Sequence, residues 1–72
     1  MPKLIPVSGH EAVRRFEQAG WKLARIHGSH AVMIKPGTNV NLAIPLHKEL
    51  GIGILRKLIH LAGLTVQEFD SL

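Results

Sequence analysis

The chain has 72 residues, no cysteine and a net charge of +4. We expect one small domain over residues 1–72, because two domains would leave neither half enough chain to enclose a core. The lack of cysteine excludes a disulfide framework and a thiolate metal cluster. We expect a cytoplasmic protein, since the N-terminus shows no secretory pattern and no segment is long and apolar enough to span a membrane.

The charge is unevenly distributed along the chain. Residues 3–57 carry all nine lysines and arginines against three acidic side chains, a net +6, whereas residues 58–72 carry two acidic side chains and no lysine or arginine. A basic body favours a polyanionic partner, of which nucleic acid is the commonest. A solvated basic surface without a partner has the same composition, so charge alone does not separate the two.

The first predicted element is a helix that begins after Ser8. Ser8 and Glu11 have the spacing of a capping box, in which each side chain bonds the other residue's backbone N–H. Apolar residues then recur at helical spacing, and Gly20 is expected to end the helix in a left-handed conformation.

Three strands follow in the prediction. Residues 21–27 and 30–35 are two of them, joined by Gly28-Ser29, a pair that suits a two-residue turn. Residues 40–44 alternate apolar and polar side chains, which predicts a half-buried third strand that Pro45 ends. Tight connections favour an antiparallel arrangement.

The last predicted elements are a helix over about 52–62, ended by Gly63, and a short helical turn capped by Thr65 and Glu68. The chain is therefore expected to be an α+β domain of order α-β-β-β-α. Its three-stranded antiparallel sheet would carry both helices on one face and leave the other face open. Double-stranded-RNA-binding domains share this order.

The predicted turn places two histidines side by side. His27 and His30 would form a cross-strand pair with Cβ atoms about 4.5–5.5 Å apart. Imidazole exchanges protons near neutral pH, and RNA cleavage by transesterification needs one proton removed from the 2′-hydroxyl and one given to the leaving 5′-oxygen. Histidines near turns are more often solvated polar residues, so a structural role is the alternative.

Two other interpretations concern neighbouring residues. Trp21 opens a strand beside a helix end, so we expect it in the core, and a base-stacking platform is the alternative. A metal site built from His27, His30 and His47 ranks lowest, because their spacing matches no known metal motif and no carboxylate is near them in the sequence. We expect neither a metal nor a cofactor.

Four short motifs occur in order along the chain. They are Ala19-Gly20-Trp21, then Arg25 before Gly28-Ser29-His30, then Pro45-Leu46-His47, and finally residues 55–64 with Glu68-Phe69. In this order and spacing they resemble the HicA family of small toxins from bacterial and archaeal toxin–antitoxin systems. The resemblance covers nearly the whole chain.

The resemblance implies a double-stranded-RNA-binding-domain-like fold and ribonuclease activity on mRNA with no required metal. It also implies a HicB-type antitoxin that covers the active face. The family's catalytic histidine corresponds to His30. A second proton carrier at His27 is our own inference, because the family does not require histidine there. His47 matches a recurrent family position, where it could act on substrate or close the end of the third strand.

The chain departs from the family pattern at Ile54, where the family often has threonine. We expect this change to remove a helix cap worth about 1 kcal/mol without removing catalytic chemistry.

Eight residues are candidates for holding the RNA: Lys22, Arg25, Gly28, Ser29, Lys35, Lys48, Arg56 and Lys57. The strand cations would hold phosphate, and Arg25 would also steady charge that develops on the phosphate oxygens. Two alternatives stay open, namely a non-catalytic RNA-binding module and a protein-interaction domain that uses the open sheet face. The basic motif of non-catalytic duplex binders is missing at the second helix, which favours the enzyme.

Overall fold

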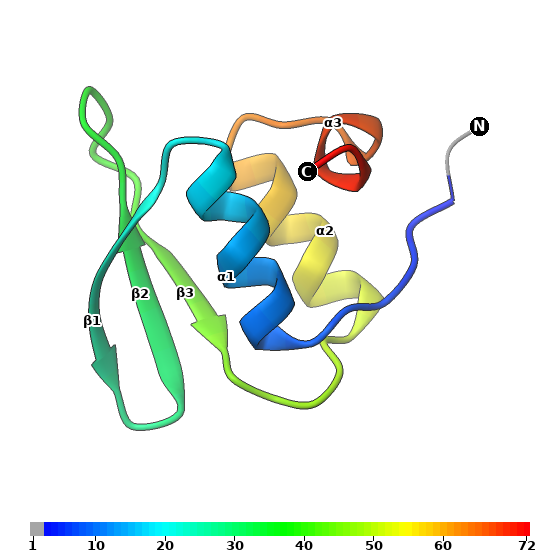
Figure 1. Cartoon of the computed structure of the whole chain (residues 1–72), viewed down its shortest axis with the longest axis horizontal. Coiled ribbons are helices and arrows are strands. Elements are labelled where there is room, and N and C mark those ends of the chain that lie inside the picture. The colour runs from blue at the N-terminus through cyan, green and yellow to red at the C-terminus, as the bar shows by residue number, and fades with distance from the viewer. Residues whose placement is uncertain (1–2) are drawn as a thin grey trace.

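The computed structural model describes residues 3–72 and confirms the predicted α-β-β-β-α order (Figure 1). The elements are α1 (Gly9–Gln18), β1 (Lys22–His27), β2 (His30–Ile34), β3 (Leu42–Pro45), α2 (Ile52–Leu61) and α3 (Val66–Asp70). The fold is a small α+β arrangement with an open sheet. No helix in the described part of the chain is long and apolar enough to cross a membrane.

The sheet has the order β1-β2-β3, and both strand pairs are antiparallel. Both long helices lie to the same side of it (Figure 1). The burial pattern agrees, because Ala31, Met33, Leu42 and Ile44 alternate with more exposed residues along β2 and β3 and are buried under the helices. Such alternation is typical of a sheet with one covered face.

The helices cover β2 and β3 but leave β1 uncovered. All six residues of β1 are exposed. Leu23 and Ile26 pair with the buried Met33 and Ala31, so they point to the helix side of the sheet, yet they remain 43% and 58% exposed. The predicted covered face therefore spans only two of the three strands.

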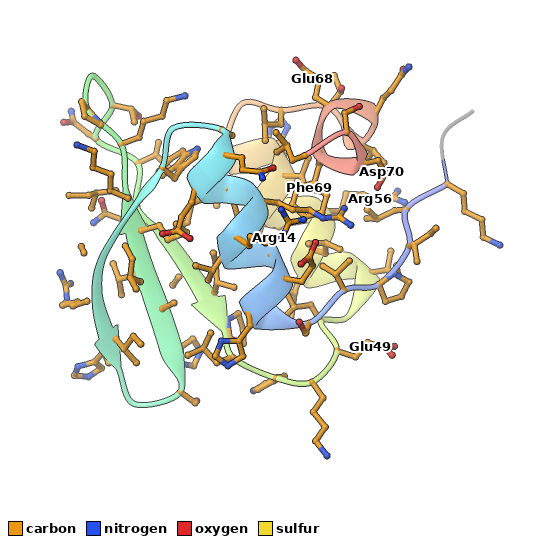
Figure 2. All side chains as sticks on the ribbon, in the orientation of Figure 1. Arg14, Glu49, Arg56, Glu68, Phe69 and Asp70 are labelled. Atoms are coloured by element: carbon orange, nitrogen blue, oxygen red, sulfur yellow. The ribbon has the colours of Figure 1, made fainter. Side chains whose placement is uncertain are left out.

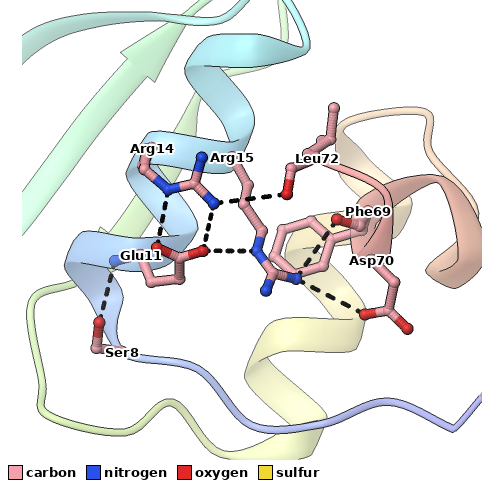
Figure 3. Close-up of polar contacts among 7 residues, drawn as sticks. All are labelled: Ser8, Glu11, Arg14, Arg15, Phe69, Asp70 and Leu72. Atoms are coloured by element: carbon pink, nitrogen blue, oxygen red, sulfur yellow. Dashed lines mark hydrogen bonds and ion pairs between the residues drawn. The ribbon is translucent and has the colours of Figure 1, made fainter.

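The C-terminal helix is held against α1 by one aromatic and one ionic cluster. The rings of Phe16 and Phe69 are both buried, with centroids 5.2 Å apart. Arg15 lies over the Phe69 ring at 5.0 Å and reaches the Asp70 carboxylate at 3.7 Å (Figure 3). Aromatic and cation–π contacts of this kind add to the energy of burial.

The predicted third strand is wrong at both ends. Residues 40–44 were expected, whereas β3 runs over Leu42–Pro45. The Val40 N–H donates to Thr38 Oγ1 at 3.1 Å, so this residue belongs to the loop. Pro45 continues the strand as the partner of His30, which is possible because β3 lies at the sheet edge, where a strand tolerates a residue without an N–H.

The predicted capping box at α1 is only half formed. The Glu11 N–H donates to Ser8 Oγ at 3.0 Å, as expected. The Glu11 carboxylate does not return to Ser8, and instead accepts hydrogen bonds from Arg14 (2.9 and 2.6 Å) and Arg15 (2.9 Å) (Figure 3). Two guanidinium groups outcompete one backbone N–H for the carboxylate, because charge-assisted hydrogen bonds are the stronger ones.

The other two capping predictions have opposite outcomes. The box between Thr65 and Glu68 is complete in both directions. The cap expected at position 54 is wrong, because the N-cap of α2 is Gly51 and Ile54 already lies inside the helix. The isoleucine therefore removes no cap, and α2 begins without a side-chain cap at all.

The hydrogen bonds of the Glu11 carboxylate with Arg14 and Arg15 predict a pH-dependent contribution to stability. Hydrogen bonds from Arg14 and then Arg15 lower the pKa of Glu11 from 4.5 to about 2. A carboxylate with a lowered pKa stabilises the folded state above its unfolded pKa, and this contribution is lost as the pH falls toward the folded value. We predict that Glu11→Gln lowers the free energy of unfolding at neutral pH and removes this acid-dependent step in urea titrations.

Glu17→Gln is the matched control, since Glu17 is exposed on the same helix and makes no ion pair within residues 3–72. It should leave the pH profile unchanged. Identical profiles for the Glu11 variant and the unmodified chain would contradict the assignment.

Candidate active site

The hairpin between β1 and β2 confirms the predicted histidine pair. Gly28 and Ser29 form a two-residue turn, and His27 faces His30 across it. Gly28 has φ 62°, while no residue other than glycine in the described part of the chain has positive φ. A positive φ at only the first turn position is typical of a II′ hairpin turn. Both imidazoles are exposed and therefore accessible to a substrate.

A β-bulge in β1 decides which side chains share the open face. Lys22 pairs with Ile34 and Arg25 pairs with Val32, so Ala24 is the extra residue of the bulge. In a regular strand, residues three apart point to opposite faces. The bulge returns Lys22 and Arg25 to one face, the open one, because their partners on β2 lie between its buried residues.

The open face thus carries a row of polar side chains that we call the basic strip: Lys22, Arg25, His27 and His30. All four are exposed. Lys and Arg side chains are the usual partners of phosphate oxygens, and Arg can bond them in bidentate fashion. The strip therefore offers cations along β1 and an imidazole pair at its end, which are the groups needed to hold and cleave a phosphodiester.

Backbone hydrogen bonds bring the segment after β3 to the same end of the molecule. The Leu46 N–H donates to the Ser29 carbonyl at 2.7 Å, and the Gly9 N–H donates to the His47 carbonyl at 2.9 Å. His47, an exposed residue, thus lies beside the hairpin turn. His10 follows Gly9 in the first turn of α1 and is also exposed, so the backbone segments that carry four of the histidines meet at this end.

Gly9 permits this gathering because α1 touches the end of β3 there. A Cβ at Gly9 would lie 2.8 Å from the Leu46 Cα and would also overlap the Pro45 carbonyl. Such an approach is open only to glycine. The sequence signal for this close contact is Gly9 itself, a glycine in the first turn of a capped helix where no loop needs it.

The other predicted RNA ligands occupy separate places. Lys48 follows His47 in an exposed bend near the histidines. Lys35 lies at the opposite end of the hairpin, with its Nζ 6.0 Å from the centroid of the Trp21 ring. Arg56 and Lys57 are exposed on α2, and Figure 2 shows Arg56 on the side of the molecule remote from β1. Trp21 itself is buried, as expected.

The hairpin that carries the basic strip has no acidic side chain. Residues 18–48 contain no Asp or Glu, and Figure 2 shows Glu68 and Asp70 around α3, across the molecule from β1. The cations of the strip therefore have no neighbouring carboxylate within their own hairpin. Within residues 3–72, no three His, Cys, Asp or Glu side chains form a group that could hold a metal ion.

The comparisons with known proteins give one informative result. The family model of the HicA toxin of bacterial toxin–antitoxin systems matches residues 9–64, which is more than half of the chain. The matched segment runs from α1 through α2 and includes the basic strip and His47. No curated protein matches the chain.

The tight contact at Gly9 predicts opposite effects for two glycine substitutions. Gly9→Ala should lower the free energy of unfolding by about 1–3 kcal/mol, because the methyl group forces the backbone at Pro45 and Leu46 to move. Gly53→Ala in α2 meets nothing within 4 Å and should raise stability by about 0.5–1 kcal/mol. Urea unfolding measures both changes, and equal effects would contradict the close-contact role of Gly9.

Proposed function

The chain belongs to the HicA toxin family, and from this premise we propose that it is an endoribonuclease that cleaves mRNA in the cytoplasm and thereby inhibits translation and growth. Family membership implies pairing with an antitoxin. The observation that carries the ribonuclease proposal is the exposed pair of His27 and His30 at the end of a row of cations. Acid–base groups beside phosphate ligands are what transesterification of RNA requires.

In the proposed reaction, His30 removes the proton from the substrate's 2′-hydroxyl. The oxygen attacks the adjacent phosphorus, the bond between phosphorus and the 5′-oxygen breaks, and a proton passes to that leaving oxygen. The products are a 2′,3′-cyclic phosphate and a free 5′-hydroxyl. Because RNA supplies the nucleophile and the imidazoles supply the proton transfers, the residues of the basic strip suffice without a metal.

His30 is the better-supported acid–base group of the pair. It lies on β2, the central strand, where its backbone pairs with both His27 and Pro45. A catalytic side chain performs best when its support is rigid. We assign His27 the second proton transfer, because it faces His30 on the same side of the sheet, and His47 a place at the edge of the same substrate site.

The cations take separate roles in this proposal. Lys22 and Arg25 hold phosphates along the open face, and Arg25, the nearer to the histidines, also stabilises charge on the reacting phosphate. Gly28 and Ser29 let the RNA backbone approach the turn, since there is open space where a side chain at Gly28 would stand. Lys48 extends the phosphate contacts beyond His47.

A HicB-type antitoxin would neutralise the toxin by covering the basic strip. An acidic partner surface fits this face, because the hairpin carries cations and no carboxylate. Such a partner buries His30 and competes directly with RNA. A non-catalytic RNA-binding module would use the same cations, and the exposed imidazole pair is the observation that favours the enzyme.

The catalytic assignment predicts the behaviour of a His30→Ala variant. It should fold normally, because His30 is exposed, but cleave RNA at least about 100-fold more slowly, since general acid–base catalysis supplies about 10²–10⁴-fold. Its expression should no longer stop growth. Circular dichroism and cleavage of a labelled mRNA measure the two properties.

His60→Ala serves as the matched control, because His60 is an exposed histidine on α2 and has no place in the site. It should remain toxic and active. A His30 variant that keeps full activity would overturn the assignment.

The reaction chemistry predicts the products and their conditions. Cleavage should persist in EDTA, leave a 2′,3′-cyclic phosphate, and spare DNA of the same sequence, which lacks the 2′-hydroxyl. Mass spectrometry of the fragments identifies the end group. Cleavage that needs added Mg²⁺, or that leaves a 5′-phosphate, would contradict the mechanism.

A further inference from the structure

A cavity of about 310 Å³ lies at the end of the hairpin opposite the histidine turn. Its walls are Trp21 before β1, the turn at Pro36–Thr38 after β2, and residues 61–63 at the end of α2. The proposed cleavage reaction leaves this cavity unused. Its volume is at the lower end of the range of small-molecule sites, about 300–1,000 Å³, so it suits one small group.

Part of the Trp21 indole lines this cavity. Trp21 is only 3% exposed, and its Nε1 is buried with no hydrogen-bond partner among residues 3–72. A buried donor without a partner costs about 1–3 kcal/mol. This N–H group is shielded from solvent, so a ligand in the cavity contacts the ring of Trp21 and not this donor.

One cationic side chain, that of Lys35, lies at the same cavity. Lys35 lines it and places its Nζ 6.0 Å from the Trp21 ring centroid. Within the described residues no carboxylate lies within ion-pair distance of Lys35. Its side chain passes close to Gly20, which has no side chain to obstruct it. A flexible, unpaired ammonium group can turn toward an anion at the cavity mouth.

We propose that this cavity binds one nucleotide of the RNA substrate, with the base against Trp21 and Leu61 and the phosphate on Lys35. The Trp21 ring, the apolar side chain of Leu61 and the cation of Lys35 match a base and its phosphate. An acidic peptide side chain would use the cation alone. The proposal rests on the proposed function for the identity of its ligand.

To reach this cavity from the basic strip, the RNA would pass around one end of the hairpin. Lys22 follows Trp21 directly and pairs with Ile34, the residue before Lys35, so the two lysines flank the same end of the hairpin on opposite faces. From His30 to Ile34 the strand rises by about 13 Å, at about 3.3 Å per residue. The bound nucleotide is therefore not at the cleaved bond, and the cavity would set sequence preference at a distance from it.

Trp21 is the only tryptophan of the chain, so its fluorescence reports directly on the cavity. The full-length His30→Ala variant is titrated separately with AMP, GMP, CMP and UMP, and with inorganic phosphate and polyglutamate as comparators. We expect a saturable change in emission with at least one nucleotide and none with the two comparators.

Lys35→Met is the test variant, because it keeps the apolar stem of the side chain and removes only the charge. It should weaken nucleotide binding about tenfold, as expected for one charge-assisted contact. Lys3→Met is the matched control, since Lys3 is exposed in the N-terminal segment, and it should bind unchanged. The proposal is overturned if no nucleotide changes the emission, if Lys35→Met binds as well as the control, or if polyglutamate gives the same response.

A cleavage assay separates this proposal from the proposed function. In an otherwise unmodified chain, Lys35→Met should raise KM for RNA and leave kcat largely intact, whereas His30→Ala lowers kcat. Nucleotide binding without any RNA cleavage would sustain the cavity assignment and overturn the endoribonuclease. Cleavage that proceeds with unchanged KM in Lys35→Met would sustain the endoribonuclease and overturn the cavity assignment.

Discussion

The contact between Gly9 and the end of β3 is the constraint on which the arrangement of this molecule depends. It lets the first turn of α1 lie directly on the backbone of Pro45 and Leu46. Two backbone hydrogen bonds then join three distant segments, because Gly9 bonds His47 and Leu46 bonds Ser29. A helix start, a strand end and a hairpin turn are thus held together by backbone contacts, which place His47 beside the turn that carries His27 and His30.

The two faces of the sheet differ in burial and in charge. The face under the helices buries apolar residues of β2 and β3, while the open face carries the basic strip. A chain of this size builds one small core and has little further chain with which to enclose a deep active site. A flat surface is sufficient if the substrate carries the nucleophile, as RNA does.

Signals carried by single residues predicted the helices, strands and turns well. The features that were not predicted depend on which groups pair with one another. Gly20, Gly63 and the turn at Gly28 end or reverse the chain through their own backbone freedom, so the sequence shows them directly. The bulge at Ala24 is different, because it depends on how β1 pairs with β2 and leaves no mark in composition. Likewise, two arginines and one backbone N–H compete to donate hydrogen bonds to the Glu11 carboxylate, and the outcome decides whether the capping box is complete. The histidine turn could therefore be predicted, whereas the alignment of Lys22 with Arg25 could not.

The uncovered first strand gives the two imidazoles unequal supports. His30 stands on a strand bonded on both sides, while His27 stands on an edge strand whose six residues are all exposed. Segments with few buried contacts open at lower free energy than the core does. His30 therefore has the firmer support of the two. In the proposed reaction, His27 is the side chain that would adjust to RNA strands of differing local shape.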